Sequence, residues 1–285
     1  MPGYKNFAVV GAGGIGGAII EELLNSQSTG AVDKIVLLTR PESASKHEAL
    51  AARGVTIARV DYSSSSEVSK ALAGVEVVIC TLSHNALGVQ LPVAEAAKAA
   101  GAQLFVPTDF GSPTDDATEG VHLVKEETNK NIRALGLPTA RFFTGVFSDG
   151  IWVPYLNLDL KSGSVGVGGD GNAKASFTSC IDIARYVVYV LATLSPSETK
   201  NKTFRIEGER ASFNEIFAAY EKKHGVKLQV KYTPISELEE NLKKNPRDIV
   251  SNLHLVGASG KSTVGSPIDN DLFPAWNPKP VIHYL

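Results

Sequence analysis

The chain of 285 residues is long enough to bury a large core, either as one large domain or as two smaller ones. Its 28 basic and 30 acidic residues leave a formal net charge of −2, which favours neither a nucleic acid nor a membrane surface as partner. Two cysteines, Cys80 and Cys180, exclude a disulfide framework, and no apolar run approaches the ~20 residues of a membrane helix. The N-terminus leads directly into an expected strand, so we expect no signal peptide and a cytoplasmic protein.

Apolar, β-rich segments alternate with helical patterns through the first half of the chain. We expect strands at residues 7–10, 34–39, 55–61, 75–82, 103–108 and 139–144, with helices at 15–25, 43–53, 65–73, 87–100 and 122–135. Near-continuous apolar strands such as residues 75–80 are typical of a parallel sheet that is covered on both faces. The alternation therefore predicts an α/β fold, a Rossmann-type doubly wound parallel sheet, whose ligands bind at the carboxyl ends of the strands.

The pattern changes after residue 148, where the chain becomes irregular and rich in glycine. Regular patterns return as a helix at 182–194, a strand at 203–206, helices at 214–224 and 235–244, and a strand at 228–232 between those two helices. Beyond Asn245 the regularity is lower, which predicts a tail that wraps the surface. We therefore expect a nucleotide-binding Rossmann domain of residues 1–150 plus 176–208 and a smaller substrate-binding lobe of residues 151–175 plus 209–285.

A glycine-rich turn follows the first strand, where residues 8–17 read Ala-Val-Val-Gly-Ala-Gly-Gly-Ile-Gly-Gly. Gly11 permits the tight turn, Gly13 and Gly14 keep Cβ atoms away from phosphates, and Gly16 and Gly17 let the next helix pack closely on the strand. That helix, which starts near Ile15, directs its amides and its positive dipole end at an anion. The turn predicts a site for the pyrophosphate of a dinucleotide; the alternative is an ordinary structural turn.

The end of the second strand distinguishes NAD from NADP. A carboxylate there bonds the ribose of NAD, whereas an arginine accommodates the 2′-phosphate of NADP. This chain reads Thr39-Arg40-Pro41 and carries Lys46 in the next helix, so it has no acid at the strand end. We therefore expect NADP(H) as cofactor, with Glu42 as the residue able to weaken this preference; the alternative is a solvated surface arginine.

Further candidates for cofactor contacts stand at the ends of the next three strands. Asp61 is expected to reach the adenine, and Thr81, Leu82 and Ser83 are expected beneath the ribose. The run Pro107, Thr108, Asp109 and Phe110 is expected next to the nicotinamide. The same residue types also end strands without any ligand, so position in the fold supports these assignments more than residue type does.

A lysine takes the place of the usual proton-handling pair. Short-chain dehydrogenases use Tyr-x-x-x-Lys on one helix, and no tyrosine in this chain has a lysine four residues later. The corresponding helix offers Lys125, with Lys130 farther along. The pKa of a lysine, ordinarily about 10.4, must fall by about three for the amine to act as a base near neutral pH, and desolvation lowers it. A charged lysine donates a proton without such a change, although most helical lysines are simply solvated.

Several segments in order resemble those of the NmrA-like, atypical short-chain dehydrogenases, and among them the isoflavone reductase-like proteins that include the phenylcoumaran benzylic ether reductases. The similar segments are the glycine turn with Arg40, residues 105–111 (Phe-Val-Pro-Thr-Asp-Phe-Gly), Lys125 eleven residues before Gly136-Leu137-Pro138, residues 169–175, Asp182-Ile183 and Asn214-Glu215-Ile216. The resemblance implies that Lys125 is catalytic and exchanges a proton while NADPH delivers a hydride to an aromatic substrate. Lys125 and Phe143 are also expected to contact the cofactor.

The expected function is that of an NADPH-dependent reductase of a small aromatic compound, phenylpropanoid- or flavonoid-like, with a carbonyl or benzylic ether as the reacting group. Phe110, Phe147, Trp152 and Tyr155 are the candidates for the aromatic pocket, although some of them are expected in the core.

The first alternative to a reductase is an NmrA-like redox sensor that binds NAD(P) without turnover, and the second is a small-molecule-binding protein that has lost the chemistry. No metal site is expected, because the histidines form no close ligand pair. A monomer and a homodimer both remain open.

Overall fold

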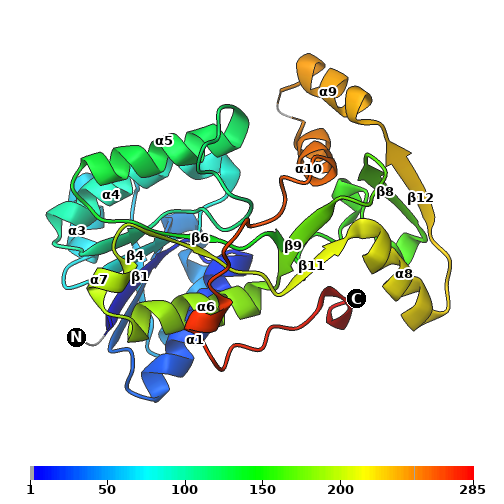
Figure 1. Ribbon diagram of the computed structural model, residues 1–285. Coiled ribbons are helices and arrows are strands. Elements are labelled where there is room, and N and C mark those ends of the chain that lie inside the picture. Colours follow the sequence, from blue (N-terminus) through cyan, green and yellow to red (C-terminus); the bar gives the residue numbers. More distant parts are fainter. Residues whose placement is uncertain (1–2, 247) are drawn as a thin grey trace.

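Five parallel strands form the central sheet of the computed structural model, which describes residues 3–246 and 248–285 (Figure 1). Their order in the sheet is β3 (Thr56–Arg59), β2 (Lys34–Thr39), β1 (Asn6–Val10), β4 (Val77–Cys80) and β5 (Leu104–Val106). Every neighbouring pair is parallel. The order reverses between β1 and β4, and in such sheets the crevice above that point binds ligands.

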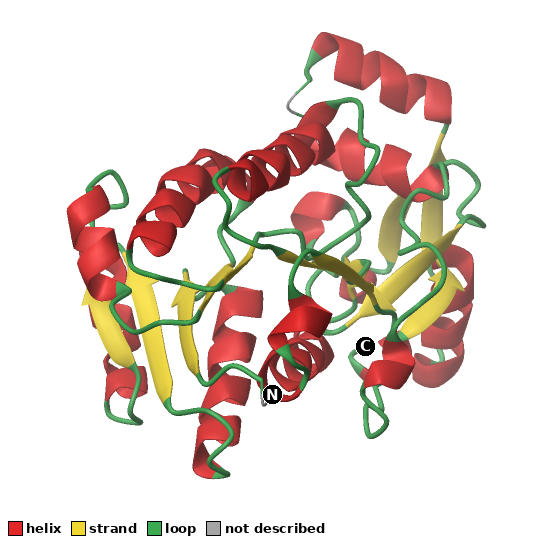
Figure 2. Cartoon of the chain, turned by 60° about the vertical axis from the view of Figure 1, so that its left-hand side comes forward, coloured by secondary structure: helices red, strands yellow, loops and turns green. Residues whose placement is uncertain are grey.

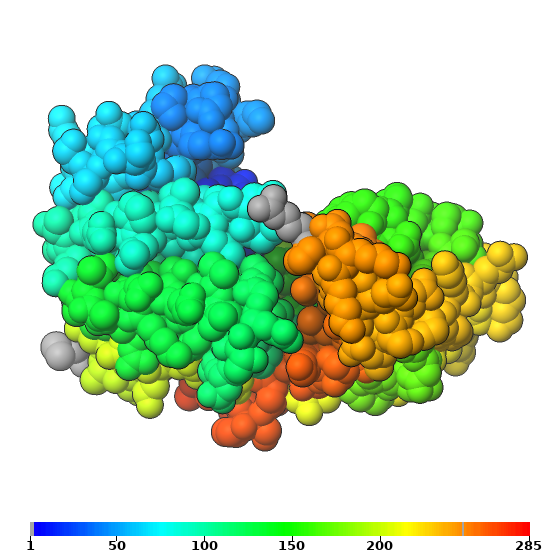
Figure 3. Space-filling model, turned by 90° about the horizontal axis from the view of Figure 1, so that it is seen from above, coloured from blue at the N-terminus to red at the C-terminus, as the bar shows by residue number. Residues whose placement is uncertain are grey.

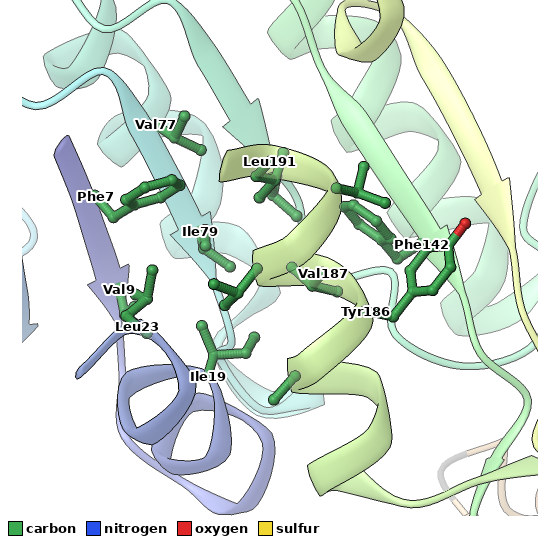
Figure 4. Close-up of a cluster of buried hydrophobic side chains, with 14 of the residues drawn as sticks. Phe7, Val9, Ile19, Leu23, Val77, Ile79, Phe142, Tyr186, Val187 and Leu191 are labelled. Carbon is green, nitrogen blue, oxygen red and sulfur yellow. The ribbon is translucent and has the colours of Figure 1, made fainter. Parts of the chain in front are cut away.

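Alternate residues of the central strands face two separate hydrophobic cores. Phe7 and Val9 of β1 face α1 (Gly14–Ser28) and α6 (Cys180–Thr193), as Figure 4 shows. Ala8 and Val10 face the other core, to which α3 (Ser65–Ala71), α4 (Gln90–Ala99) and α5 (Gly120–Ala134) contribute. Helices on both faces explain why these strands are apolar throughout, and the expected doubly wound fold is confirmed.

Two more strands continue the sheet beyond β5. A parallel bridge joins Phe105 to Thr139, directly before β6 (Ala140–Phe143), and β10 (Lys202–Arg205) pairs with β6 in parallel. Between β6 and β10 the chain leaves the sheet, forms part of the smaller lobe and returns through α6 and α7 (Pro196–Thr199). The loops at the carboxyl ends of β5 and β6 therefore lie next to the smaller lobe.

The smaller lobe contains two small sheets and three helices, seen from a second side in Figure 2. One sheet has the order β11 (Glu209–Ser212), β9 (Lys174–Thr178), β7 (Val146–Phe147), and the other pairs β12 (Gln229–Thr233) with β8 (Ser164–Gly168). The helices are α8 (Phe213–His224), α9 (Ile235–Lys244) and α10 (Ile249–Ala258). Ser212 begins α8 because its hydroxyl accepts from the Glu215 amide while the Glu215 carboxylate accepts from the Ser212 amide.

The expectation of low regularity beyond Asn245 is wrong, because α10 follows directly. Asp248 begins this helix as its N-cap, accepting a hydrogen bond of 3.1 Å from the Ser251 amide. After α10 the chain does form the expected tail, which returns to the larger domain: Trp276 packs on Tyr186 of α6 and donates to the Asp182 carbonyl. The division into residues 1–150 plus 176–208 and residues 151–175 plus 209–285 remains a prediction; the sheet of β11, β9 and β7 crosses these bounds, because residues 146–147 and 176–178 fall in the first part.

Among residues 3–246 and 248–285, no helix is both long and apolar enough to cross a membrane. The same part of the chain brings no three histidine, cysteine or acidic side chains together as metal ligands.

Candidate active site

The glycine turn has an open outer side and a tight inner side. Gly11 adopts a φ of +88°, which favours glycine, and a Cβ at Gly16 would lie 2.4 Å from both the Gly11 carbonyl oxygen and the Thr81 Oγ1. A Cβ at Gly13 or Gly14 would meet nothing within 4 Å. The start of α1 is thus open to a ligand, and Gly13 at the N-cap has no side chain to accept from its first amides.

One part of the expectation for this turn is wrong. A Cβ at Gly17 would meet nothing within 4 Å, so only Gly16 is required for the close packing of helix on strand. Ile15 is partly buried against the core on the α1 face of the sheet, which leaves its backbone amide as the group available to a ligand. The open outer side and the exposed amides fit the pyrophosphate of a dinucleotide.

Arg40 stands directly after β2 and is about two-thirds exposed. Its Nε lies 3.2 Å from the Oε1 atom of Glu42, so the expected competitor of a phosphate is its partner in this structure. Thr39 is buried, whereas Lys46 is exposed on the 3-10 helix formed by residues 41–47. Arg40 and Lys46 therefore place two positive charges after β2, and Arg40 is already paired with the exposed carboxylate of Glu42.

The residues expected to contact the cofactor after the third and fourth strands differ in exposure and in their hydrogen-bond partners. The Asp61 carboxylate is exposed and accepts from the Ser63 amide, which lowers the pKa of that carboxyl. Thr81 donates to the Gly11 carbonyl at 2.8 Å and so holds the turn against β4. Leu82 lies beside Gly11, and Ser83 precedes the 3-10 helix of residues 84–89.

The residues after β5 are held by hydrogen bonds to neighbouring segments. Thr108 donates its hydroxyl to the Leu82 carbonyl at 3.0 Å, and its amide donates to the Gln90 side chain at 2.8 Å. Gln90 is buried and was not expected from the sequence. These bonds fix the position of the loop of residues 107–110, at the edge where the nicotinamide was expected.

A buried ionic cluster lies behind this loop. The Arg141 guanidinium contacts the Asp109 carboxylate at 2.7 Å, the Glu126 carboxylate at 2.9 Å and the Thr114 hydroxyl. Arg141 and Asp109 are almost completely buried, and Glu126 is about one-tenth exposed. The guanidinium also stands 4.8 Å from the centre of the Phe143 ring. We call Asp109, Glu126, Arg141 and Thr114 the ionic cluster.

The side chains of two expected cofactor contacts are buried in this structure. The Asp109 side chain is 1% exposed and belongs to the ionic cluster. Phe143 is fully buried, with the Arg205 guanidinium 4.9 Å from its ring centre in addition to that of Arg141. Both side chains therefore pack against arginine side chains, and a contact of these two residues with the cofactor stays a prediction.

A cavity of about 390 Å³ lies between the larger domain and the smaller lobe. Phe110, Phe147 and Tyr155 line it, as expected, together with residues of β8 and α10. Trp152 does not line it, because its indole donates to the Ser148 carbonyl at 2.7 Å and packs edge-on against Phe213. The wall is predominantly apolar and aromatic, which suits a small aromatic compound. We call this space the first cavity.

Lys125 projects from α5 to the wall of the first cavity. It is partly buried, and burial is the main cause that lowers its pKa. The negative charge of Asp109 acts in the opposite direction, while the positive charge of Arg141 adds to the lowering. The first cavity therefore has a single lysine on its wall whose proton is held less tightly than in water.

Three histidines on this wall were also missed, and one of them, His254, comes from α10. His84 comes from the 3-10 helix after β4, and His122 comes from α5, three residues before Lys125. The spacing of three on an expected helix was a usable signal for His122, because such residues share one face. No sequence pattern pointed to the ionic cluster, whose members come from separate segments.

The family model described as the NmrA-like family matches residues 4–273. A phenylcoumaran benzylic ether reductase of Betula pendula is 30% identical over 255 residues, 85% of this chain and 82% of that protein. One of Ginkgo biloba is 29% identical over 240 residues, 79% and 77% of the two chains. The solved complex of a leucoanthocyanidin reductase of Vitis vinifera with NADPH superposes with a TM-score of 0.83 at 22% identity, covering 97% of each chain. That structural likeness shows the fold.

Proposed function

The chain belongs to the NmrA-like family, among its isoflavone reductase-like members, and from this premise we propose that it is an NADPH-dependent reductase of a small aromatic compound. The proposed substrate is phenylpropanoid- or flavonoid-like and carries a carbonyl or a benzylic ether. The observation that carries the proposal is the position of Lys125 on the wall of an apolar, aromatic cavity, on the edge of the sheet where the glycine turn is open. The reductase names of the relatives from Betula pendula and Ginkgo biloba agree with it.

NADPH, when bound, supplies the hydride. The exposed amides at the start of α1 would hold its pyrophosphate, and the open space beside Gly13 and Gly14 supports this role. Arg40 and Lys46 would bind the 2′-phosphate, where a guanidinium makes charge-assisted hydrogen bonds. The leucoanthocyanidin reductase complex with NADPH is consistent with that assignment.

Lys125 would give its proton to the substrate oxygen as the hydride reaches the neighbouring carbon. In a carbonyl reduction that oxygen becomes the hydroxyl, and in a benzylic ether reduction it becomes the phenol after the carbon–oxygen bond breaks. The ammonium form is the donor, and burial lowers its pKa. If proton donation limits the rate, turnover should fall as the pH rises through that lowered pKa, because the ammonium is lost.

The test is NADPH oxidation with aromatic carbonyls, quinones and phenylpropanoid ethers. We expect Lys125→Ala to lower kcat by about 10²-fold or more at equal NADPH occupancy, the range of general acid–base catalysis. Arg133→Ala is the matched control, because Arg133 lies on the same helix with an exposed side chain and neither lines this cavity nor belongs to the ionic cluster. We expect its turnover to stay within about twofold of wild type, the scale of a surface substitution.

Two results would contradict parts of this proposal. Unchanged turnover in Lys125→Ala would remove this lysine from the mechanism while leaving the reductase in place. Tight NADPH binding by the wild type, without turnover of any compound in the panel, would favour the redox sensor.

A further inference from the structure

A second cavity, of about 1050 Å³, adjoins the first. It lies between the helices α9 and α10 on one side and, on the other, the loop of residues 112–119 with the first turn of α5, and Figure 3 shows the orange α9 beside this green part of the chain. Its wall carries more charged side chains, with carboxylates from Asp115, Asp116, Glu119 and Glu239 and ammonium groups from Lys243 and Lys261. A space of this size and polarity holds water.

Five residues line both cavities: Ser112, Val121, His122, Asn252 and Val256. Among these five, His122 is the one whose side chain titrates near neutral pH. Lys125 lines the first cavity and is not among the residues that line the second. A substrate that fills the first cavity would separate Lys125 from water on that side, and His122 then connects this wall with the second cavity.

We propose that His122 relays protons from the second cavity to Lys125, a role that rests on the proposed reductase function. After Lys125 has given its proton to the substrate oxygen, its free amine accepts a proton from His122, which takes a proton from water in the second cavity. An imidazole suits this role because one ring nitrogen can accept a proton while the other donates. Each cycle then moves one proton from water to product and restores both side chains.

The charged groups around the ring support rapid release of the proton. Burial lowers the pKa of His122, and the positive charges of Lys125 on the same helix and Lys261 after α10 lower it further. The negative charge of Asp109, after β5, opposes them. The ring is therefore neutral near pH 7 and does not retain a proton that it receives.

The test compares wild type with His122→Ala and His122→Phe. His122→Phe keeps a ring in place and removes the titrating nitrogens, whereas His122→Ala leaves space for added imidazole. We expect both variants to lose about tenfold in kcat at pH 8, less than the 10²–10⁴-fold of a group that touches the substrate oxygen. KM and NADPH affinity should remain within about twofold. Imidazole buffer should restore turnover of His122→Ala in proportion to its concentration and leave wild type and His122→Phe unchanged.

The control is His224→Gln, since His224 lies at the end of α8, with its ring centre 4.4 Å from that of Tyr220, and lines neither cavity. A kcat within twofold of wild type in His122→Ala and His122→Phe across pH 6–9 would overturn the relay and leave the reductase intact. If His122→Phe kept the wild-type kcat while His122→Ala lost it, the role of His122 would be packing and the relay would be overturned. The same conclusion would follow if imidazole failed to restore the turnover of His122→Ala. An inactive wild type would instead overturn the reductase itself, and with it the relay.

Discussion

Two parts of the same sheet edge deal with charge in opposite ways. At the carboxyl ends of β1 and β2, the turn consists of glycines and backbone atoms. The first turn of α1 contains no acidic side chain that could pair with the amides there. At the carboxyl ends of β5 and β6, charged side chains are buried and already paired, with Arg141 between Asp109 and Glu126. The first region leaves its backbone amides free for a ligand anion, whereas the second region pairs two buried carboxylates with one guanidinium.

That difference indicates how each region would serve a reductase. Backbone amides without a partner at the start of a helix attract the phosphates of a cofactor. The charges of the ionic cluster act on Lys125 in opposite directions, because Asp109 raises the pKa of the lysine whereas Arg141 lowers it. Substitutions in the first region should therefore act mainly on cofactor affinity, and those in the second mainly on folding and proton chemistry.

The largest effect is expected at Arg141. Arg141→Met would leave the carboxylates of Asp109 and Glu126 buried without their shared partner, which costs about 3–5 kcal/mol in the free energy of unfolding. Lys174→Met is the matched control, because Lys174 pairs with Glu215 at the surface, where the loss is about 0–1 kcal/mol. Urea denaturation measures both. If the two variants lost similar stability, the ionic cluster would be no more important than a surface pair.

A smaller effect is expected at the glycine turn, where Gly16 and Gly17 form a matched pair. Gly16→Ala would place a Cβ 2.4 Å from the Gly11 carbonyl oxygen, which costs about 1–3 kcal/mol of overpacking and distorts the turn. Gly17→Ala meets nothing and removes a helical glycine, so we expect it to stabilise the protein by about 0.5–1 kcal/mol.

Thermal unfolding and NADPH titration test this pair together. We expect NADPH affinity to drop at least tenfold in Gly16→Ala, since a shift of the turn by a few tenths of an ångström breaks more than one phosphate contact at about 1.4 kcal/mol per factor of ten. Affinity should be retained in Gly17→Ala. Equal loss of affinity in both variants would mean that the ligand needs space at Gly17 that the structure leaves open.

The glycine turn could be predicted because its signal is local: strand, turn and helix are consecutive, and each glycine has a separate steric reason. Even there, Gly17 was assigned a packing role that a repeated glycine pattern suggests and the backbone does not require. The helix α10 was missed although Asp248, an N-cap residue type, precedes its apolar run. Local patterns thus predicted the elements of the larger domain better than those of the smaller lobe.

The ionic cluster could not be predicted in the same way. Asp109 follows a strand, Glu126 lies in a helix, and Arg141 lies in another strand, so nothing in their spacing indicates contact. Phe143 was expected at the cofactor and is instead enclosed by the guanidinium groups of Arg141 and Arg205. Only the packing of β6 and β10 beside the loop after β5 brings these groups together.

The smallest effect is expected directly after β2, where we expect Arg40 to distinguish NADPH from NADH. Its guanidinium is about two-thirds exposed, so one contact with the 2′-phosphate should contribute about 1.4 kcal/mol, a tenfold change in Kd. Arg40→Ser should therefore weaken NADPH binding about tenfold and leave NADH binding unchanged. Fluorescence titration at fixed ionic strength measures both, because added salt weakens exposed contacts.

Glu42→Gln should change NADPH affinity in the opposite direction, and the same titration measures it. The variant keeps the shape of the side chain and removes the carboxylate that lies 3.2 Å from the Arg40 Nε atom. NADPH binding should tighten by about twofold to threefold, since an exposed pair is worth about 0.2–1 kcal/mol. If Arg40→Ser weakened NADPH and NADH equally, the arginine would be contacting a group that both cofactors share, and Arg40 would not select between them.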